Sequence, residues 1–421
     1  MTLLQTPVLT LLRHAALLSL LAAAAWAGPA QAGPSKWKQY GGNGDQSNYN
    51  RGEQVLTAGN VTTLVPVWTG REGVVPTDLP AMQHGAFYGT NRKFGLSAIS
   101  QTRGLRKWSE PDARSTCTPA LSPDGRVLTL AYRYKGQFGQ GALMAVDAST
   151  GAFLWSRPIS AIVDGCTSVV GNMVVVATDK GWTQSYNVSD GGTGNGSSLL
   201  KFTFPIDLHV AGQGRWYYVV ATTGRRVYQV NGREKSGKSP RGWNTSLGTL
   251  TSGTASTGRI AGTALVVSDS AGGVYALELA TGAPRWSVAL PTAAGTTPGV
   301  TATTDTSAYA VARPAGASAD AIDALALDTG SVSWTSPLPD SLLVHSNLVV
   351  ANGMVFAGTG ATTCTTLSVL DAATGAPIAT LPSGMPPAGD ERCDLAVANG
   401  RVVLHGTQGT LPSMQVLGLP S

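Results

Sequence analysis

The chain has 421 residues, of which 43% are hydrophobic and 13% charged, with 52 Gly, 24 Pro and a formal net charge of +5. This composition supplies a large apolar core and excludes an intrinsically disordered chain. No basic stripe with interleaved aromatic residues occurs, so we expect no nucleic-acid partner. The low charge and high glycine content favour many short strands joined by tight turns.

Residues 1–32 have the pattern of a secretory signal peptide. Arg13 and His14 precede an apolar stretch from Ala15 to Ala27, and Ala30-Gln31-Ala32 matches a signal-peptidase site. An apolar stretch of about 13 residues is shorter than the ~20 that a membrane-spanning helix needs. We therefore predict that the mature chain is exported, either secreted or periplasmic, and has no integral membrane segment. An uncleaved anchor is the alternative.

The rest of the chain divides into a lead-in segment, residues 33–61, and one repeat domain, residues 62–421. In the repeat, an apolar strand is followed by Asp or a small polar residue, then Thr-Gly, then a strand that ends in Trp. The copies cover residues 95–108, 142–155, 273–286, 322–334 and 367–379, the last with Ala379 in place of Trp. Trp68 and Trp243 extend this series, and successive Trp residues from Trp68 to Trp334 are then spaced by 40–48 residues or about twice that, which is typical of β-propeller blades.

Each repeat unit is expected to form four strands. In the unit that ends at Trp155, we predict strands at 117–121, 126–133, 142–147 and 153–155. Asp124-Gly125 and Thr150-Gly151 connect two of the strand pairs, because glycine supplies the positive φ that tight hairpins require. We assign the recurring Trp residues to packing between blades rather than to ligand stacking.

The repeat count predicts an all-β, eight-bladed propeller of four-stranded blades. The last unit supplies only three strands, at 393–398, 401–405 and 414–417. We expect Leu64–Trp68, near the mature N-terminus, to add the fourth, since pairing of the two chain ends removes an open sheet edge. Seven blades is the alternative if the degenerate copy near residue 200 is only an insertion.

The repeat resembles that of the pyrroloquinoline quinone (PQQ) propeller superfamily. The segment Trp37-Lys38-Gln39-Tyr40-Gly41-Gly42, followed by Asn48-Tyr49-Asn50, is similar to the lead-in of such proteins. The resemblance implies either a quinoprotein dehydrogenase with PQQ and a metal ion on the axis, or a binding protein such as the outer-membrane assembly lipoprotein. This chain lacks the adjacent Cys-Cys pair of many dehydrogenases and the lipidation Cys of the assembly lipoprotein.

Four cysteines follow the signal peptide: Cys117, Cys166, Cys364 and Cys393. An even number in an exported chain favours disulfides, and four cysteines allow three connectivities. Alignment of the blades favours Cys117 with Cys166 and Cys364 with Cys393, because each pair would then join neighbouring blades.

Alignment of the blades also places a polar set where the inner strands meet one mouth of the central channel. Its members are His84, Asp164, Asp207, His209, His345, Glu391 and Asp394. Such side chains could converge on a cation, since carboxylates suit calcium and imidazoles suit transition metals. The alternative is that they bond to backbone groups and water. The sequence does not single out any group of residues as metal ligands.

The sequence contains no catalytic motif of the hydrolase, zinc-protease or nucleotide-binding kinds. The leading hypothesis is therefore a monomeric, non-catalytic exported scaffold without a cofactor, which binds a protein or small ligand at the propeller rim. The alternative is a PQQ- and calcium-dependent oxidoreductase acting on alcohols or sugars, with Asp164, Asp207, Glu391 or Asp394 as base. A glycan-binding or polysaccharide-degrading propeller has only fold analogy behind it.

Overall fold

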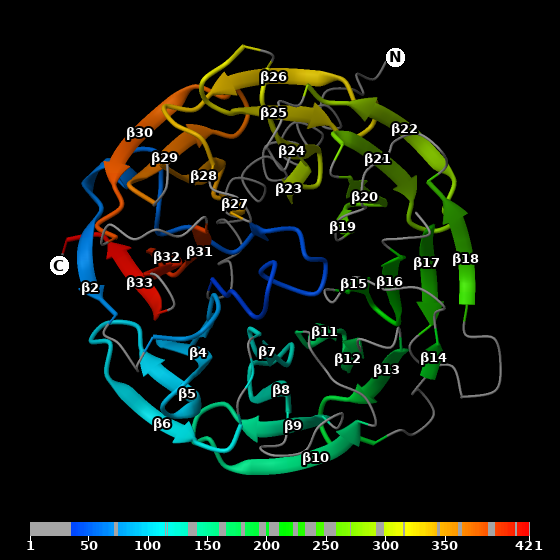
Figure 1. The fold of residues 1–421 in the computed structure, drawn as a ribbon, viewed down its shortest axis with the longest axis vertical. Helices are drawn as coiled ribbons and strands as arrows, with labels where there is room; N and C mark the ends of the chain where they lie inside the picture. Colours follow the sequence, from blue (N-terminus) through cyan, green and yellow to red (C-terminus); the bar gives the residue numbers. More distant parts are fainter. Residues whose placement is uncertain are drawn as a thin grey trace, which may run out of the picture. The chain divides into compact units, whose positions relative to one another are not determined.

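The fold is an eight-bladed β-propeller, seen along its axis in Figure 1. The computed structural model describes residues 35–70, 75–113, 115, 117–133, 141–159, 166–177, 182–192, 199–201, 210–221, 226–231, 241–247, 258–269, 271–291, 299–314, 316–342, 346–360, 364–385, 392–408 and 411–420. Residues 35–421 form one compact unit. The predicted signal peptide, residues 1–32, lies outside the described residues. The eight-bladed prediction is confirmed, and the seven-bladed alternative is wrong.

Seven blades consist of four consecutive antiparallel strands, which run from the axis outwards. The first blade contains β3 (Ala81–Gln83), β4 (Ala86–Asn91), β5 (Gly95–Ser100) and β6 (Arg106–Glu110). The second contains β7 (Ala120–Leu121), β8 (Val127–Arg133), β9 (Gly141–Asp147) and β10 (Phe153–Ile159). The third contains β11 (Ser168–Val170), β12 (Met173–Ala177), β13 (Trp182–Asn187) and β14 (Leu199–Lys201). The predicted strands of the second blade are thus observed, with a shorter inner strand. Strand β14 is the degenerate copy near residue 200, so this copy is a true blade.

The next four blades follow the same order. They are β15 (Ala211–Gln213), β16 (Trp216–Ala221), β17 (Arg226–Asn231) and β18 (Arg241–Ser246); β19 (Arg259–Ala261), β20 (Ala264–Ser268), β21 (Gly273–Glu278) and β22 (Pro284–Ala289); β23 (Gly299–Thr303), β24 (Ser307–Ala312), β25 (Ala321–Ala326) and β26 (Val332–Pro337); and β27 (Leu348–Ala351), β28 (Met354–Thr359), β29 (Thr366–Asp371) and β30 (Pro377–Pro382).

The eighth blade combines both ends of the chain. It contains β31 (Asp394–Ala398), β32 (Arg401–Gln408) and β33 (Leu411–Gly418), and its outer strand is β2 (Val65–Thr69). In the antiparallel pairing of β2 with β33, Val65 lies opposite Gly418 and Thr69 opposite Gln415. The predicted closure of the ring by the N-terminal strand is therefore confirmed. A 3₁₀ turn, η1 (Val61–Thr63), leads into β2.

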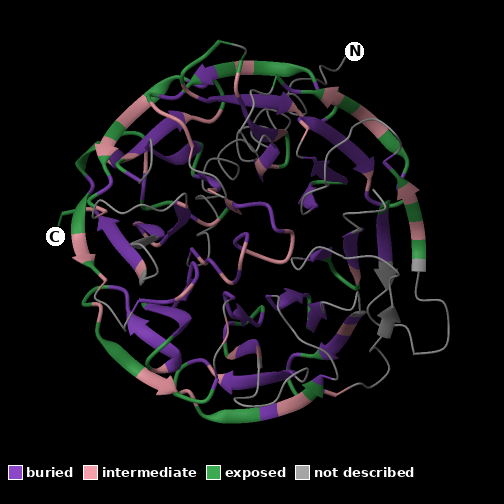
Figure 2. Ribbon diagram, in the orientation of Figure 1, coloured by how far each residue is buried: buried purple, intermediate pink, exposed green. Residues whose placement is uncertain are grey.

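Burial follows the position of a strand within its blade (Figure 2). Each blade packs between two others, so both faces of its central strands are covered and these strands are largely buried. All five residues of β12 are buried, for example. The outer strands have a solvent-facing side, and β30 is accordingly a mixture of exposed and half-buried residues.

The recurring Trp residues join neighbouring blades by hydrogen bonds as well as by packing. The indole Nε1 of each donates to a backbone carbonyl of the next blade at 2.8–3.2 Å. The glycine of the next Thr-Gly turn lies against the indole ring: Gly330 has φ +73, and a Cβ there would come within 2.6 Å of Trp286. The motif therefore recurs because its Trp and its Gly meet across blade boundaries. The donors are Trp68, Trp108, Trp155, Trp243, Trp286 and Trp334.

The lead-in segment runs inside the ring of inner strands, as the blue trace in the centre of Figure 1 shows. Residues 37–50 of this segment bond to every blade in turn. Trp37 pairs with Met82 of the first blade, and the Asn50 side chain donates to Val397 O of the eighth at 2.6 Å. For the six blades between them, the amides of Leu121, Val169, Gly212, Ile260, Thr303 and Val350 donate to Lys38 O, Gln39 Oε1, Gly44 O, Asp45 O, Ser47 O and Asn48 O, at 2.6–2.9 Å.

This circular course closes with strand β1 (Tyr49–Asn50), which pairs in parallel with β27 and makes the seventh sheet five-stranded. Tight turns are needed to bend the segment, and Gly41 and Gly42 have φ of +70 and +91. The lead-in and the blades consequently belong to one hydrogen-bonded unit.

Candidate functional site

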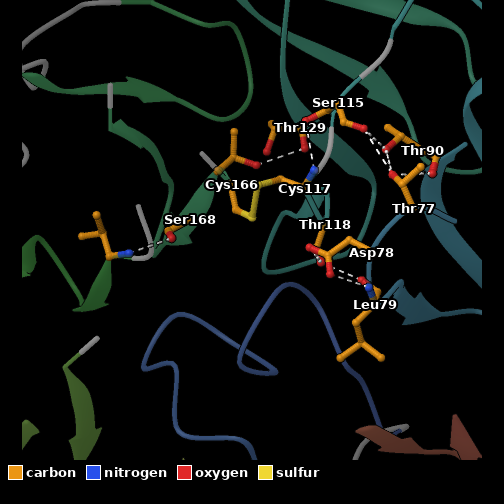
Figure 3. Close-up of a disulfide and its surroundings, with 12 residues drawn as sticks. Thr77, Asp78, Leu79, Thr90, Ser115, Cys117, Thr118, Thr129, Cys166 and Ser168 are labelled. Carbon is orange, nitrogen blue, oxygen red and sulfur yellow. Dashed lines mark hydrogen bonds between the residues drawn. A yellow bond between two sulfur atoms is a disulfide. The ribbon is translucent and has the colours of Figure 1, made fainter. Parts of the chain in front are cut away.

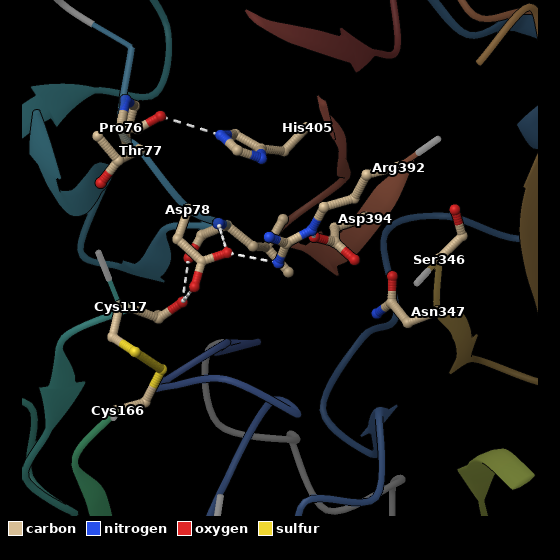
Figure 4. Close-up of polar contacts among 12 residues, drawn as sticks. Pro76, Thr77, Asp78, Cys117, Cys166, Ser346, Asn347, Arg392, Asp394 and His405 are labelled. Atoms are coloured by element: carbon tan, nitrogen blue, oxygen red, sulfur yellow. Dashed lines mark hydrogen bonds and ion pairs between the residues drawn. A yellow bond between two sulfur atoms is a disulfide. The ribbon is translucent and has the colours of Figure 1, made fainter. Parts of the chain in front are cut away.

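The axial cluster, which we define as Asp78, Arg392, Asp394 and His405, brings four titratable side chains of the first and last blades together (Figure 4). Asp78 lies just before the inner strand β3 of the first blade, and Arg392 lies just before β31 of the eighth. Asp394 begins β31, and the antiparallel register places His405 of β32 directly opposite it. The cluster therefore forms where the first and last blades meet.

Arg392 lies between the two carboxylates. Its Nη2 donates to Asp78 Oδ1 at 2.7 Å, and its Nε donates to Asp394 Oδ2. Asp78 also accepts a hydrogen bond from Leu79 N at 2.9 Å and one from the Thr118 hydroxyl at 3.3 Å. Because both carboxylates are buried and bond to the same guanidinium, Arg392 offsets part of their negative charge and joins the two blades.

Burial and neighbouring charges shift the pKa values of Arg392 and of Tyr40, a nearby residue of the lead-in segment. Burial alone would lower the pKa of Arg392, but the charges of Asp394 and Asp78 hold it above its ordinary value. Burial, and after it the charge of Asp394, raises the pKa of Tyr40 to about 12. Tyr40 belongs to the lead-in segment, so the side chains of the lead-in and of the axial cluster act on each other electrostatically. The Arg392 cation and the neutral Tyr40 phenol are the stable forms at neutral pH.

The Cys117–Cys166 disulfide lies beside Asp78, as Figure 3 shows. It joins the segments that precede β7 and β11, and hence the second and third blades. The Cys364–Cys393 disulfide joins the seventh and eighth blades. The two Cα–Cα distances are 4.8 and 5.5 Å. Both predicted pairings are confirmed.

The structure places only two of the seven channel-mouth candidates. Asp164, Asp207, His209, His345 and Glu391 lie outside the described residues. Asp394 is in the axial cluster. His84 is not: it lies in the exposed β3–β4 turn, at the opposite end of β3 from Asp78, with φ +50.

The expected placement of His84 beside Asp394 is therefore corrected. The cause is a short inner strand, because β3 spans three residues and ends at Gln83, so His84 already belongs to the turn. Its Nε2 lies 3.1 Å from Gln83 Nε2. Sequence reasoning also missed Asp78 and His405, because their relation to Asp394 depends on which blades adjoin and on strand register. The position of Asp78 just before an inner strand was the available signal.

The described part of the axis does not fit a calcium ion. Ligand atoms of Asp78, Asp394 and His405 lie within 4.8 Å of one another. Calcium takes six to eight oxygen ligands. Here both carboxylates already bond to Arg392. His405 offers ring nitrogens rather than oxygen, and its Nε2 lies 2.9 Å from Pro76 O. A cation at this point would compete with the guanidinium for the same oxygens, so we derive no chemistry from calcium or PQQ here.

Comparison with known proteins assigns the chain to a family of PQQ-like propellers. The model of the family described as outer membrane protein assembly factor BamB matches residues 49–161, 92–313 and 217–416. The chain belongs to this family, as the repeat indicates. No curated protein sequence matches the chain.

Several solved structures share the fold at low sequence identity. BamB from Moraxella catarrhalis is 14% identical with a TM-score of 0.57, over 84% of this chain and 99% of that one. A quinohemoprotein alcohol dehydrogenase from Pseudomonas putida HK5 is 13% identical with a TM-score of 0.62, over 92% and 80%. A europium-containing methanol dehydrogenase is 12% identical with a TM-score of 0.64, over 92% and 99%. These likenesses establish the fold, which is common to binding proteins and enzymes.

Among the described residues, no helix is both long and apolar enough to cross a membrane.

Proposed function

We propose that this protein is an exported, non-catalytic propeller that binds a protein partner through its outer rim. The proposal rests on the observation that the polar groups near the propeller axis bond to one another and to the lead-in segment. The lead-in segment bonds to all eight inner strands, and Arg392 bonds to both carboxylates of the axial cluster. A general base must be able to accept a proton from a substrate, and a carboxylate held by a guanidinium is poorly suited to that task.

The outer strand of the second blade supplies a candidate contact surface. A β-bulge between Phe153 and Trp155 turns the indole inward, so that Phe153 and Leu154 are both exposed, at 61% and 44%. Two adjacent exposed apolar side chains on a rigid strand are suited to a protein interface. The family model, described as an assembly factor, also favours a binding role. The two disulfides support export to an oxidising compartment, periplasmic or extracellular.

A photo-crosslinking amino acid at position 153, introduced into the exported full-length chain, tests this proposal. We expect a reproducible crosslink from position 153 to one protein. In a second experiment the crosslinking amino acid is placed at position 157 of the same strand. The crosslink from position 157 should disappear when the folded double variant Phe153→Ser, Leu154→Ser replaces the two exposed apolar side chains. The matched control is position 332, where Val332 is 49% exposed two residues before Trp334, as Phe153 is before Trp155. Equal capture at both positions, or none at either, would contradict the proposal.

The quinoprotein alternative is tested separately, with a dye-linked assay on alcohols and sugars after incubation with PQQ and calcium. Three of its candidate bases, Asp164, Asp207 and Glu391, lie outside the described residues, and the fourth, Asp394, bonds to Arg392. Turnover that depends on added PQQ would replace the scaffold proposal with an enzymatic one.

A further inference from the structure

A surface pocket of about 230 Å³ lies between the first and second blades. Tyr88, Lys107 and Trp108 line it from β4 and β6 of the first blade. Arg126 and Ala148 line it from the second blade, next to the start of β8 and the end of β9. At roughly 30 Å³ per water molecule, the volume corresponds to about eight waters, or to one small organic molecule.

One of the residues that line the pocket, Ala148, stands at a position where two other blades have leucine and the seventh blade has Ala372. Ala148 provides the carbonyl that accepts the Trp108 indole hydrogen bond. In the fifth and sixth blades the equivalent acceptors are Leu279 and Leu327, and both leucines are buried. Leu279 packs in one apolar cluster with Tyr218 and Trp243, and Leu327 in one with Trp286.

The hydroxyl group of Tyr88 differs in its hydrogen bonding from those of the equivalent tyrosines in two other blades, Tyr218 and Tyr309. Tyr88, Tyr218 and Tyr309 each pack against the Trp of their own blade, with ring centroids 5.8–6.1 Å apart. Tyr218 donates to Leu279 O at 3.3 Å, and Tyr309 donates to Ala372 O at 3.1 Å. Tyr88 lines the pocket and is 3% exposed, and its hydroxyl makes no hydrogen bond in the part of the chain that the structure describes. The Tyr88 hydroxyl is therefore free to donate a hydrogen bond to a ligand acceptor in the pocket.

The charges at the pocket favour an anion. Lys107 is exposed and forms no ion pair among the described residues, and the Arg126 side chain is 83% exposed, with Asp124 only at 4.0 Å. The one carboxylate in the lining, Asp147, is occupied by its own turn: its Oδ1 accepts bonds from the backbone and hydroxyl groups of Ser149 and Thr150. Those bonds, that of the Ser149 hydroxyl first, lower the pKa of Asp147. Two cations therefore face the ligand against one internally bonded anion.

We propose that this pocket binds a small organic acid with a second oxygen acceptor, such as a dicarboxylate or hydroxy acid. Lys107 and Arg126 hold the acid group at the mouth. The inner oxygen accepts a hydrogen bond from the Tyr88 hydroxyl, and the carbon chain lies against Trp108. The pocket and the surface around Phe153 adjoin the same β9–β10 hairpin, but the two proposals depend on different side chains and are tested with different ligands, so either can fail without the other.

Calorimetric titration of the full mature chain with succinate, and with its uncharged diamide as a comparison, tests the proposal. We expect succinate to bind and the diamide to bind at least about tenfold more weakly, since the loss of one charged contact is worth about 1.4 kcal/mol or more. Tyr88→Phe should weaken succinate about five- to tenfold. Lys107→Gln should weaken it and reduce its dependence on salt.

Ala148→Leu provides the sharpest variant, because leucine already occupies the equivalent position in two blades of this chain. It should fold, with an unfolding temperature near that of the wild type, and should abolish succinate binding by filling the pocket. The matched control is Ala372→Leu, which changes the equivalent residue of the seventh blade, far from the pocket, and should leave binding unchanged. Undiminished binding by folded Ala148→Leu, equal binding of succinate and the diamide, or no binding of succinate at about 10 mM would overturn the proposal.

Discussion

The axis and the rim of this propeller use their polar side chains differently. At the axis, Arg392 bonds to two buried carboxylates, and the lead-in segment bonds to each inner strand. At the rim between the first two blades, the Tyr88 hydroxyl and the Lys107 ammonium have no protein partner among the described residues. The comparison indicates that polar groups near the axis contribute to stability, whereas those at the rim are available for recognition. Four sets of variants test this distinction between the axis and the rim.

Arg392→Met should have the largest effect. It leaves Asp78 and Asp394 buried without their shared cation, and removal of one partner from such an arrangement costs about 3–5 kcal/mol. Adding Asp394→Asn should recover part of the loss, because only one buried charge then needs compensation. Urea unfolding measures both effects. The rim control, Arg126→Met, should stay within about 0.5 kcal/mol of the wild type. A loss below about 1 kcal/mol for Arg392→Met would remove the structural role of the axial cluster.

Asn50→Ala should have the next largest effect, because it cuts the attachment of the lead-in to the eighth blade. The Asn50 Nδ2 donates to Val397 O at 2.6 Å and to Ser35 Oγ at 2.8 Å, and its Oδ1 accepts from Gly52 N at 3.1 Å. Loss of these buried bonds should lower the free energy of unfolding by about 2–3 kcal/mol. Thr329→Ala, in an exposed rim turn, is the control and should change it by less than about 0.5 kcal/mol. Equal effects of the two substitutions would argue against an integral lead-in.

A pair of Tyr→Phe variants compares two rim positions directly. Tyr309→Phe removes a 3.1 Å hydrogen bond to Ala372 O and should cost about 1 kcal/mol in thermal or urea unfolding. Tyr88→Phe removes no hydrogen bond to any residue that the structure describes, so its cost should be near zero, or it should stabilise slightly. Equal losses would mean that the Tyr88 hydroxyl has a structural partner and is unavailable to a ligand.

Asp371→Asn should have the smallest effect, and one that depends on pH. Hydrogen bonds from the Thr374 hydroxyl, and then from backbone amides, lower the pKa of Asp371 in the folded state. A lowered folded-state pKa stabilises the protein above the pKa of the unfolded chain, about 3.9 for Asp, and this contribution is lost as the pH falls through the folded-state value. The substitution should therefore cost less than about 1 kcal/mol at pH 7, because solvent screens the turn. A difference that is constant over the acid range would contradict this assignment.

Much of the fold can be predicted from the sequence because its determinants are local. The Trp spacing and the Asp-Gly and Thr-Gly turns predict the blade count, and the three-stranded last unit predicts closure by β2. The disulfide pairing could be predicted because Cys117 and Cys166 occupy equivalent places in adjacent blades. The course of the lead-in could not, because most of its bonds use backbone carbonyls, which leave no side-chain pattern.

The sites were harder to predict than the fold for two physical reasons. The bond between Arg392 and Asp78 joins residues 314 positions apart, and only the closed ring brings them together. The rim pocket is lined by residues of two blades, such as Trp108 and Ala148, whose contact depends on how the blades pack in three dimensions. His84 was misplaced because the end of a three-residue inner strand cannot be located from sequence pattern alone.

Hydrogen exchange at the inner-strand amides tests most directly whether the axis is a closed structural element. The amides of Leu121, Gly212, Ile260, Thr303 and Val350 donate to lead-in carbonyls rather than to their own sheets. If the lead-in is integral to the fold, these amides should be protected to the same extent as those within the central strands, and should exchange only through cooperative unfolding. Exchange at the rate of exposed turns, with the blades still protected, would show that the lead-in detaches and leaves the axis open, which would contradict a structural role for the axis.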